Sequence, residues 1–222
     1  PEGPEGRDSP GSHAQSPCLV VEEVQGVFGM TPELRLARAG KLTASKASIV
    51  MGGLETKGLA DYVKETAWER VYGPPDEEGY KSAAMERGTL LEAEALSWYA
   101  FETGSALDQD SDRAIDHPTV PNVAASPDAL RPDRVVEVKC PMPRAWMEVK
   151  RTMKVPADYR WQVRWQMWCA GKNLADFVCY HPSAGGIIIA AELSDEDAKA
   201  MADRVPVVEA MIAEWVNILE QA

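Results

Sequence analysis

The spacing of apolar residues divides the chain into helical and extended segments. The most regular helical pattern lies at residues 83–102, where Leu91, Ala95 and Trp98 recur at the period of an α-helix. The same period, with capping residues, predicts helices at residues 32–39, after Thr43, at residues 59–72, at residues 159–170 and from Ser194 through Trp215. Gly73, Pro74 and Pro75 end the helix at 59–72 because proline cannot continue a helix.

Short segments of small and β-branched residues lie between these helices. Residues 124–128 and 135–140 are predicted to pair as a hairpin, and residues 177–181 and 187–191 as a second one. Strand alternation places Glu137 and Lys139 on one face of their strand. This order of elements predicts an α/β or α+β domain with a central mixed β-sheet flanked by helices.

Length and composition are compatible with one domain. The chain has 222 residues, of which 45% are hydrophobic and 26% charged. Residues 1–18 contain four prolines and three glycines without apolar periodicity, which predicts a disordered leader before a single domain at residues 19–222. No apolar run approaches the ~20 residues that cross a bilayer, and no secretory signal is visible, so we expect a soluble, cytoplasmic protein with no membrane partner.

The net charge of −12 argues at first against a nucleic-acid partner. Its distribution changes that picture, because residues 131–172 contain ten Lys and Arg against four acids, and residues 192–222 contain eight acids against two bases. A solvated surface of mixed charge also explains such a division. The charge pattern therefore permits DNA binding without establishing it.

Cysteine and histidine provide no obvious site. Cys18, Cys140, Cys169 and Cys179 are widely spaced and include no C-x-x-C pair, which favours reduced structural thiols. His13, His117 and His181 lack the spacing of metal ligands.

The first predicted hairpin contains the candidate chemistry. Asp128 ends one strand, and Glu137 and Lys139 project together from the next, so pairing brings two carboxylates and an ammonium to one edge. Carboxylates are hard ligands suited to Mg²⁺ or Mn²⁺, and the backbone carbonyl of Val138 is a possible further ligand. A lysine beside such a metal can position or help deprotonate a water and stabilise developing negative charge.

Each of these features also has an ordinary structural explanation. An isolated E-x-K is more often a solvated pair that supports a hairpin. Trp161, Trp165 and Trp168 are spaced as core residues of a helix, although such rings can also stack on unpaired bases. Lys150, Arg151 and Lys154 fit either a DNA-backbone contact or a solvated basic loop.

Four segments in order resemble one family. Ser126-Pro127-Asp128 followed by Glu137-Val138-Lys139-Cys140-Pro141 resembles the PD-(D/E)XK nuclease signature, in the form found in phage lambda-type alkaline exonucleases. The other three matching segments are Arg38-Ala39-Gly40-Lys41-Leu42-Thr43-Ala44-Ser45, Arg87-Gly88-Thr89-Leu90-Leu91-Glu92 and Trp161-Gln162-Val163-Arg164-Trp165-Gln166-Met167-Trp168.

The resemblance implies a restriction-endonuclease-like core and a Mg²⁺-dependent 5′-to-3′ exonuclease, with Mn²⁺ as a plausible substitute. It implies a substrate of duplex DNA with a 5′-phosphorylated end, cut to mononucleotides. It further implies a homotrimer that works beside a single-strand annealing protein in recombination, encoded by a phage or prophage in a bacterial host.

Carried over to this chain, the family's roles fall on two groups of residues. Asp128 and Glu137 would hold metal, with Glu92 as a further ligand directly or through water. Lys139 would assist the nucleophile and Gln162 would lie beside the same site. The residues that would contact phosphate are Arg38, Ser45 and Ser126.

Two positions depart from the family pattern, and two rival functions stay open. Ala129 replaces the glycine that usually follows the aspartate, and Arg164 replaces the second glutamine of the helix motif. An endonuclease, such as a junction resolvase or restriction enzyme, has the same signature. A non-catalytic DNA-binding module would retain the fold without needing Asp128, Glu137 and Lys139 together.

Overall fold

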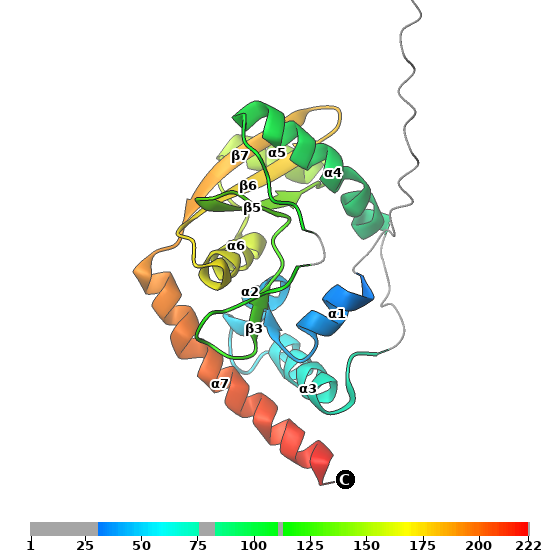
Figure 1. Ribbon diagram of the computed structural model, residues 1–222, viewed down its shortest axis with the longest axis vertical. Helices are drawn as coiled ribbons and strands as arrows, with labels where there is room; N and C mark the ends of the chain where they lie inside the picture. The colour runs from blue at the N-terminus through cyan, green and yellow to red at the C-terminus, as the bar shows by residue number, and fades with distance from the viewer. Residues whose placement is uncertain (1–30, 76–82, 111–112, 222) are drawn as a thin grey trace, which may run out of the picture.

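Two small mixed β-sheets, joined by one central helix, organise the chain (Figure 1). The computed structural model describes residues 31–75, 83–110 and 113–221, without the side chains at 83–86 and 89. The predicted leader at 1–18 lies outside the described residues. The elements in order are α1 (Pro32–Arg38), β1 (Leu42–Thr43), the 3-10 helix η1 (Ala44–Lys46), α2 (Ala47–Val50), α3 (Lys57–Tyr72), α4 (Ala83–Thr103), β2 (Ile115–Asp116), β3 (Val123–Ala125), β4 (Ala129–Leu130), β5 (Arg134–Lys139), α5 (Pro143–Thr152), α6 (Ala157–Ala170), β6 (Leu174–His181), β7 (Gly185–Glu192) and α7 (Asp195–Glu220).

The larger sheet has the strand order β4-β5-β6-β7. Strands β5 and β6 are parallel, with Glu137 opposite Phe177, whereas β4 and β7 run antiparallel to their neighbours. Helix α4 covers one face, where Tyr99 packs in a cluster with Val136 and Val178. Helices α5 and α6 cover the other face. The sheet is therefore buried on both sides, and a polar side chain that points from it is enclosed by a helix.

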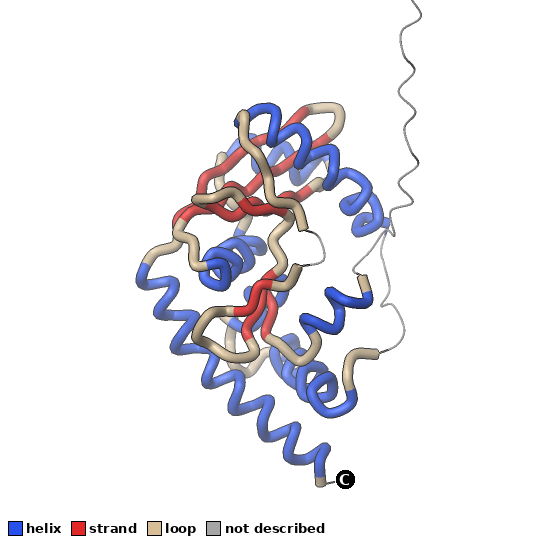
Figure 2. The backbone as a smooth tube through the Cα atoms, in the orientation of Figure 1, coloured by secondary structure: helices blue, strands red, loops and turns tan. Residues whose placement is uncertain are grey.

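The smaller sheet has the order β1-β3-β2 and lies on the other side of α6 (Figures 1 and 2). Helices α2, α3 and α7 pack around it in one hydrophobic cluster. Helix α6 contributes to both cores, because Trp165 belongs to this cluster and Met167 to the cluster under the larger sheet. The helix thus fixes the two sheets relative to each other.

Most of the predicted elements are confirmed. The predicted helices match α1, α3, α4, α6 and α7, with α2 following Thr43, and the second hairpin matches β6 and β7. Ser194 caps α7 by accepting a hydrogen bond from the backbone N–H of Asp197, 3.1 Å away. The expected mixed α+β architecture is also observed, although as two sheets.

The first hairpin is placed differently from the prediction. Residues 123–125 form β3 of the smaller sheet, and β5 instead pairs with the two residues of β4, Ala129 opposite Val136. Pro127 explains the break, because proline has no N–H for a continuous ladder. Asp128 therefore lies in the connection between the two sheets, directly before β4.

The basic segment after the site is a helix rather than a loop. Helix α5 includes Lys150 and Arg151, and Lys154 follows its end, where Met153 adopts a left-handed conformation. All three basic side chains are exposed. Within the parts of the chain that the structure describes, no helix is both long and apolar enough to cross a membrane.

Candidate active site

Glu137 is a buried carboxylate at the centre of the larger sheet. Strand alternation directs Val136 and Val138 toward α4 and Glu137 toward α6, so the carboxylate lies under a helix with only 1% of its surface exposed. A buried charge is costly unless it is hydrogen-bonded and paired. The neighbours of Glu137 meet that requirement.

Helix α6 supplies two amides to this carboxylate. Gln162 Nε2 donates to Oε1 of Glu137 at 2.6 Å, and Gln166 Nε2 donates to Oε2 at 2.5 Å. The two glutamines are four residues apart and so share one face of the helix. Together they fix the orientation of the Glu137 carboxylate.

Lys139 completes the environment of Glu137 from the same face of β5. Its ammonium donates to Oε1 of Glu137 and lies 5.4 Å from the ring centroid of Tyr159. Burial opposes the charge of the ammonium, but the carboxylates of Glu137 and Asp128 raise the pKa of Lys139 above its ordinary value. Lys139 is therefore a cation and acts as a hydrogen-bond donor.

Asp128 is hydrogen-bonded to the backbone of Val138, the residue between Glu137 and Lys139 on β5. Its Oδ2 accepts a hydrogen bond from the backbone N–H of Val138 at 2.6 Å. The buried Ala129 that follows has no positive φ angle, so this turn does not require the glycine that the family usually has. The departure at Ala129 thus leaves the position of Asp128 intact.

Helix α4 brings a third carboxylate, Glu92, to Asp128 and Glu137. Burial and the charge of Glu137 raise the pKa of Glu92, and burial and Glu137 likewise raise the pKa of Asp128 well above its usual value. The charge of Lys139 acts in the opposite direction on both. Three carboxylates therefore repel one another here, and an ammonium offsets this repulsion only in part.

A cavity of about 440 Å³ opens onto this group. Its lining includes Glu92, Asp128, Val138 and Lys139, with Tyr159 at the wall. Glu137 lies behind this lining, where its oxygens accept hydrogen bonds from the two amides and Lys139. The accessible part of the site thus consists of two carboxylates, the ammonium and the segment around Val138.

A second group contains the predicted phosphate ligands. Arg38 Nη2 donates to Ser45 Oγ at 3.0 Å, at the end of α1 and just after β1. Ser126 follows β3, which is parallel to β1, so both serines leave the same end of the smaller sheet. Ser126 Oγ is buried and has no hydrogen-bond partner among the described residues. Burial lowers the pKa of Arg38, and the charge of Glu137 is near enough to raise it in part, so the two groups are electrostatic neighbours.

Gly40 shapes the turn that presents Arg38. Its φ of +68° is unfavourable for other residues, and a Cβ there would lie 2.8 Å from Cγ of Arg70. Arg70 in turn donates to the carbonyl of Gly40 at 2.7 Å and forms two hydrogen bonds with Glu209 of α7. The glycine of the R-x-G segment is thus required both by conformation and by space.

The donor set fits a hard divalent cation. Among the described residues, no three His, Cys, Asp or Glu side chains converge closely enough to form a complete metal site. A magnesium ion does not need one, because it commonly binds through one or two carboxylates, waters and substrate oxygens. Asp128, Glu92 and Glu137, with the carbonyl of Val138, are oxygen donors. Burial, and then repulsion from Glu137, raise the pKa values of Asp128 and Glu92, and a cation would offset that repulsion.

The structure brings the predicted residues together and adds one that was missed. Gln166 was not predicted, although its spacing of four from Gln162 is a signal for a shared helix face. Arg164, by contrast, points to α7, where its Nε lies 3.0 Å from Asp197.

Trp165 is fully buried and Trp161 and Trp168 pack against the same core, which confirms their structural role. Cys140, Cys169 and Cys179 are free thiols, as expected.

Known proteins provide an independent comparison. Residues 34–173 match the YqaJ-like viral recombinase domain. The crystal structure of an alkaline exonuclease, LHK-Exo, from Laribacter hongkongensis superposes with a TM-score of 0.75 and 32% identity, covering 86% of this chain and 97% of that one. LHK-Exo in complex with dAMP gives a TM-score of 0.74 at 32% identity, covering 86% and 95%.

A more distant structure shows the same fold. A phage-related exonuclease from Haemophilus somnus 129PT has a TM-score of 0.60 at 15% identity, covering 82% of this chain and 96% of that one. A comparison with curated protein sequences gave no match. With the family match spanning most of the chain and the site arranged as described, the chain belongs to the YqaJ-like viral recombinase family and is a nuclease of the lambda-type alkaline exonuclease kind.

Proposed function

We propose that the protein degrades one strand of linear duplex DNA from a 5′-phosphorylated end, depends on Mg²⁺ and releases mononucleotides. Mn²⁺ is expected to substitute, since it accepts the same oxygen ligands. One observation supports the proposal above the others: Gln162, Gln166 and Lys139 all bond to Glu137, while Asp128 is fixed to Val138 and Glu92 lies in the same cavity. A binding module has no need for such a buried and oriented carboxylate.

The proposed roles follow from the position of each side chain. Asp128, Glu92, Glu137 and the Val138 carbonyl would hold the metal, which supplies an activated water and offsets charge on the scissile phosphate. Lys139, kept protonated by its neighbours, donates a hydrogen bond and stabilises the negative charge that develops. Gln162 and Gln166 hold Glu137 so that its orientation does not change during the reaction.

The polarity of degradation is assigned to the second group. Arg38 has a planar guanidinium suited to two parallel hydrogen bonds with a terminal phosphate, and Ser45 and Ser126 are proposed to complete that site. The charge of Glu137 raises the pKa of Arg38 in part, so a terminal phosphate held by Arg38 would lie within electrostatic range of the carboxylates. This arrangement favours cutting near the 5′ end.

The assembly and partners are also proposed. We infer a homotrimer that surrounds DNA and works with a single-strand annealing protein in phage-type recombination. In such a ring, the basic segment of residues 131–172 would face the DNA in the central channel, and the acidic helix α7 would face outward. Sedimentation at micromolar concentration tests this assembly, and a monomer would contradict it.

The decisive substrate is a linear duplex with a 5′-phosphate on one strand only, incubated with Mg²⁺ and separately with a chelator. We expect degradation of the phosphorylated strand alone and none with chelator. Equal loss of both strands would contradict the role of Arg38, and activity with chelator would contradict the metal.

Covalently closed circular DNA separates this function from that of an endonuclease. The circle should stay intact under conditions that degrade the linear form. Cutting of the circle would favour a resolvase-like or restriction-like activity of the same superfamily.

A further inference from the structure

A second buried carboxylate, Asp176, lies in the larger sheet away from the cavity. Asp176 on β6 is 4% exposed, and two of its bonds come from different elements. The hydroxyl of Tyr99 on α4 donates to Oδ2 at 2.5 Å, and Arg134 Nη1 on β5 donates to Oδ1 at 2.9 Å. We call Tyr99, Arg131, Asp133, Arg134 and Asp176 the distal cluster.

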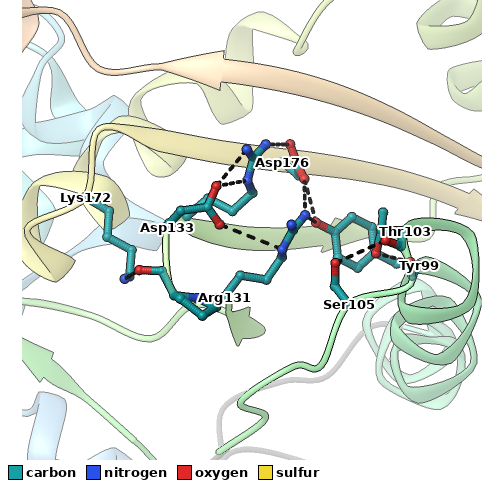
Figure 3. A network of polar contacts seen from close by, with 9 residues as sticks. Tyr99, Thr103, Ser105, Arg131, Asp133, Lys172 and Asp176 are labelled. Atoms are coloured by element: carbon teal, nitrogen blue, oxygen red, sulfur yellow. Dashed lines mark hydrogen bonds and ion pairs between the residues drawn. The ribbon is translucent and has the colours of Figure 1, made fainter.

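Arg131 ties the β4–β5 turn into the distal cluster. Its Nη1 donates to the Tyr99 hydroxyl at 3.0 Å and lies 3.6 Å from Oδ2 of Asp176. Asp133 in the same turn accepts from Arg134 at 2.8 Å. Figure 3 shows Arg131 and Tyr99 directed toward Asp176, from the turn and from α4. The cluster thus joins α4, the β4–β5 hairpin and β6.

Two of the joined segments, α4 and the β4–β5 hairpin with the residue before it, contain the candidate metal ligands. Arg131 comes three residues after Asp128, and Arg134 three residues before Glu137. Tyr99 comes seven residues after Glu92, so the two side chains lie on the same face of α4, two turns or about 10 Å apart. A rotation or shift of α4 at Tyr99 would therefore move Glu92 relative to Asp128 and Glu137.

Stability alone is a weak explanation for the cluster. Buried ion pairs offer little net stabilisation over apolar side chains of similar size, because desolvation offsets the attraction between the charges. Their geometry, in contrast, is demanding, since each donor must meet a particular oxygen. A carboxylate that binds two elements at once specifies how those elements are aligned.

We propose that the distal cluster is a positioning device that aligns α4 with the β4–β5 hairpin, so that Glu92 lies beside Asp128 at the cavity that would hold the cation. This inference rests on the proposed metal-dependent function. Tyr99 acts through Glu92, and Arg131 through Asp128, without contact with substrate or metal.

Direct titration of the full chain with Mn²⁺ in the absence of DNA tests the proposal. Tyr99→Phe removes only the hydroxyl that bonds Asp176 and Arg131, and it should weaken Mn²⁺ binding roughly tenfold, in the range found for residues that orient metal ligands. At saturating metal the KM for DNA should stay unchanged. Arg131→Lys, which keeps the charge but loses the planar donor, should shift Mn²⁺ affinity in the same direction and serves if Tyr99→Phe does not fold.

Ile212→Val is the matched control, because Ile212 is buried in the cluster of α3 and α7, in a different core from the distal cluster. It should lower the melting temperature but leave Mn²⁺ affinity as in the wild type. Equal Mn²⁺ affinity in wild type, Tyr99→Phe and Arg131→Lys would overturn the positioning role while leaving the metal site in place. Failure of the wild type to bind Mn²⁺ would overturn the proposed metal-dependent function and this inference with it.

Discussion

Gln166 donates its side-chain amide to Oε2 of Glu137 across 2.5 Å, in a contact that is fully enclosed. Gln166→Met retains the approximate volume but removes the donor, and a hydrogen bond to a charged group contributes about 1.5–3 kcal/mol. We expect kcat to fall about 10- to 100-fold, because the orientation of Glu137 is no longer fixed. Single-turnover digestion of a linear duplex measures the effect.

The control for that variant is Arg164→Gln on the same helix. Arg164 pairs with Asp197 on α7 and so lies away from Glu137. Its rate should equal that of the wild type. If Gln166→Met retained the wild-type rate, Gln166 would have no positioning function.

Substitution of Lys139 is expected to cause a large loss of nuclease activity. Lys139→Ala removes the donor to Glu137 and should lower kcat by about 10² to 10⁴, the range for a group that stabilises developing charge. Lys199→Ala, at an exposed position of α7, is the control and should have no effect. Equal release of nucleotides by Lys139→Ala and wild type would exclude the proposed mechanism.

Asp128→Asn should separate stability from activity. Burial and the charge of Glu137 raise the pKa of Asp128, so its charged form costs stability at neutral pH when no cation is bound. An asparagine oxygen can still accept from the Val138 N–H. We expect a higher melting temperature in chelator than for wild type, together with loss of nuclease activity. A lower melting temperature would contradict the electrostatic account.

Gly40→Ala should destabilise the fold. The positive φ and the contact with Arg70 both oppose a Cβ, and we expect a loss of about 1–3 kcal/mol in the free energy of unfolding, measured with urea. Gly58→Ala is the matched control. Gly58 lies in the first turn of α3 with open space around its Cα, so the alanine there should increase stability by about 0.4–1 kcal/mol. An equal change in the free energy of unfolding for Gly40→Ala and Gly58→Ala would mean that the backbone conformation at Gly40 is not constrained.

Alkaline pH should weaken the fold through Tyr99. Burial, and then the hydrogen bond to Asp176, raise the pKa of Tyr99 from 10.0 to about 12. Because the pKa of Tyr99 is higher in the folded than in the unfolded chain, the folded state is favoured by the protonated hydroxyl. This contribution to stability is complete below pH 10 and is lost as the pH rises toward 12. The two-unit shift corresponds to about 2.7 kcal/mol at most.

Urea midpoints measured across this pH range test the assignment. The wild type should lose more stability between pH 10 and 12 than Tyr99→Phe, which has no hydroxyl to ionise. Parallel curves for the two proteins would show that Tyr99 does not titrate with a raised pKa.

Local patterns predicted the helices well because their signals are local. Residues 83–102 show the apolar period of α4, and Ser194 caps α7 as its sequence indicates. The predicted partner of β5 was wrong, because a short apolar segment does not specify the strand with which it pairs. Ala124 and Ala129 both fit a strand opposite Val136, and only the arrangement of two sheets decides between them.

The site shows the same division. Asp128, Glu137 and Lys139 were identified from residue type, spacing and the family resemblance. In the structure Lys139 donates to Glu137, and the N–H of Val138 between them donates to Asp128. Gln166 was not predicted, because the family pattern has its second glutamine at position 164, where this chain has arginine. The distal cluster could not be predicted, since Tyr99 and Asp176 are 77 residues apart and only tertiary packing joins them.

Helix α6 has a consequence for when the protein can act. Its residues belong to both hydrophobic cores, and the same helix presents Gln162 and Gln166 to Glu137. A chain that has folded only one of its two sheets leaves part of α6 without its packing partners. Such a half-folded chain would not hold Gln162 and Gln166 against Glu137, so we expect the ability to cut DNA to emerge only with the finished fold.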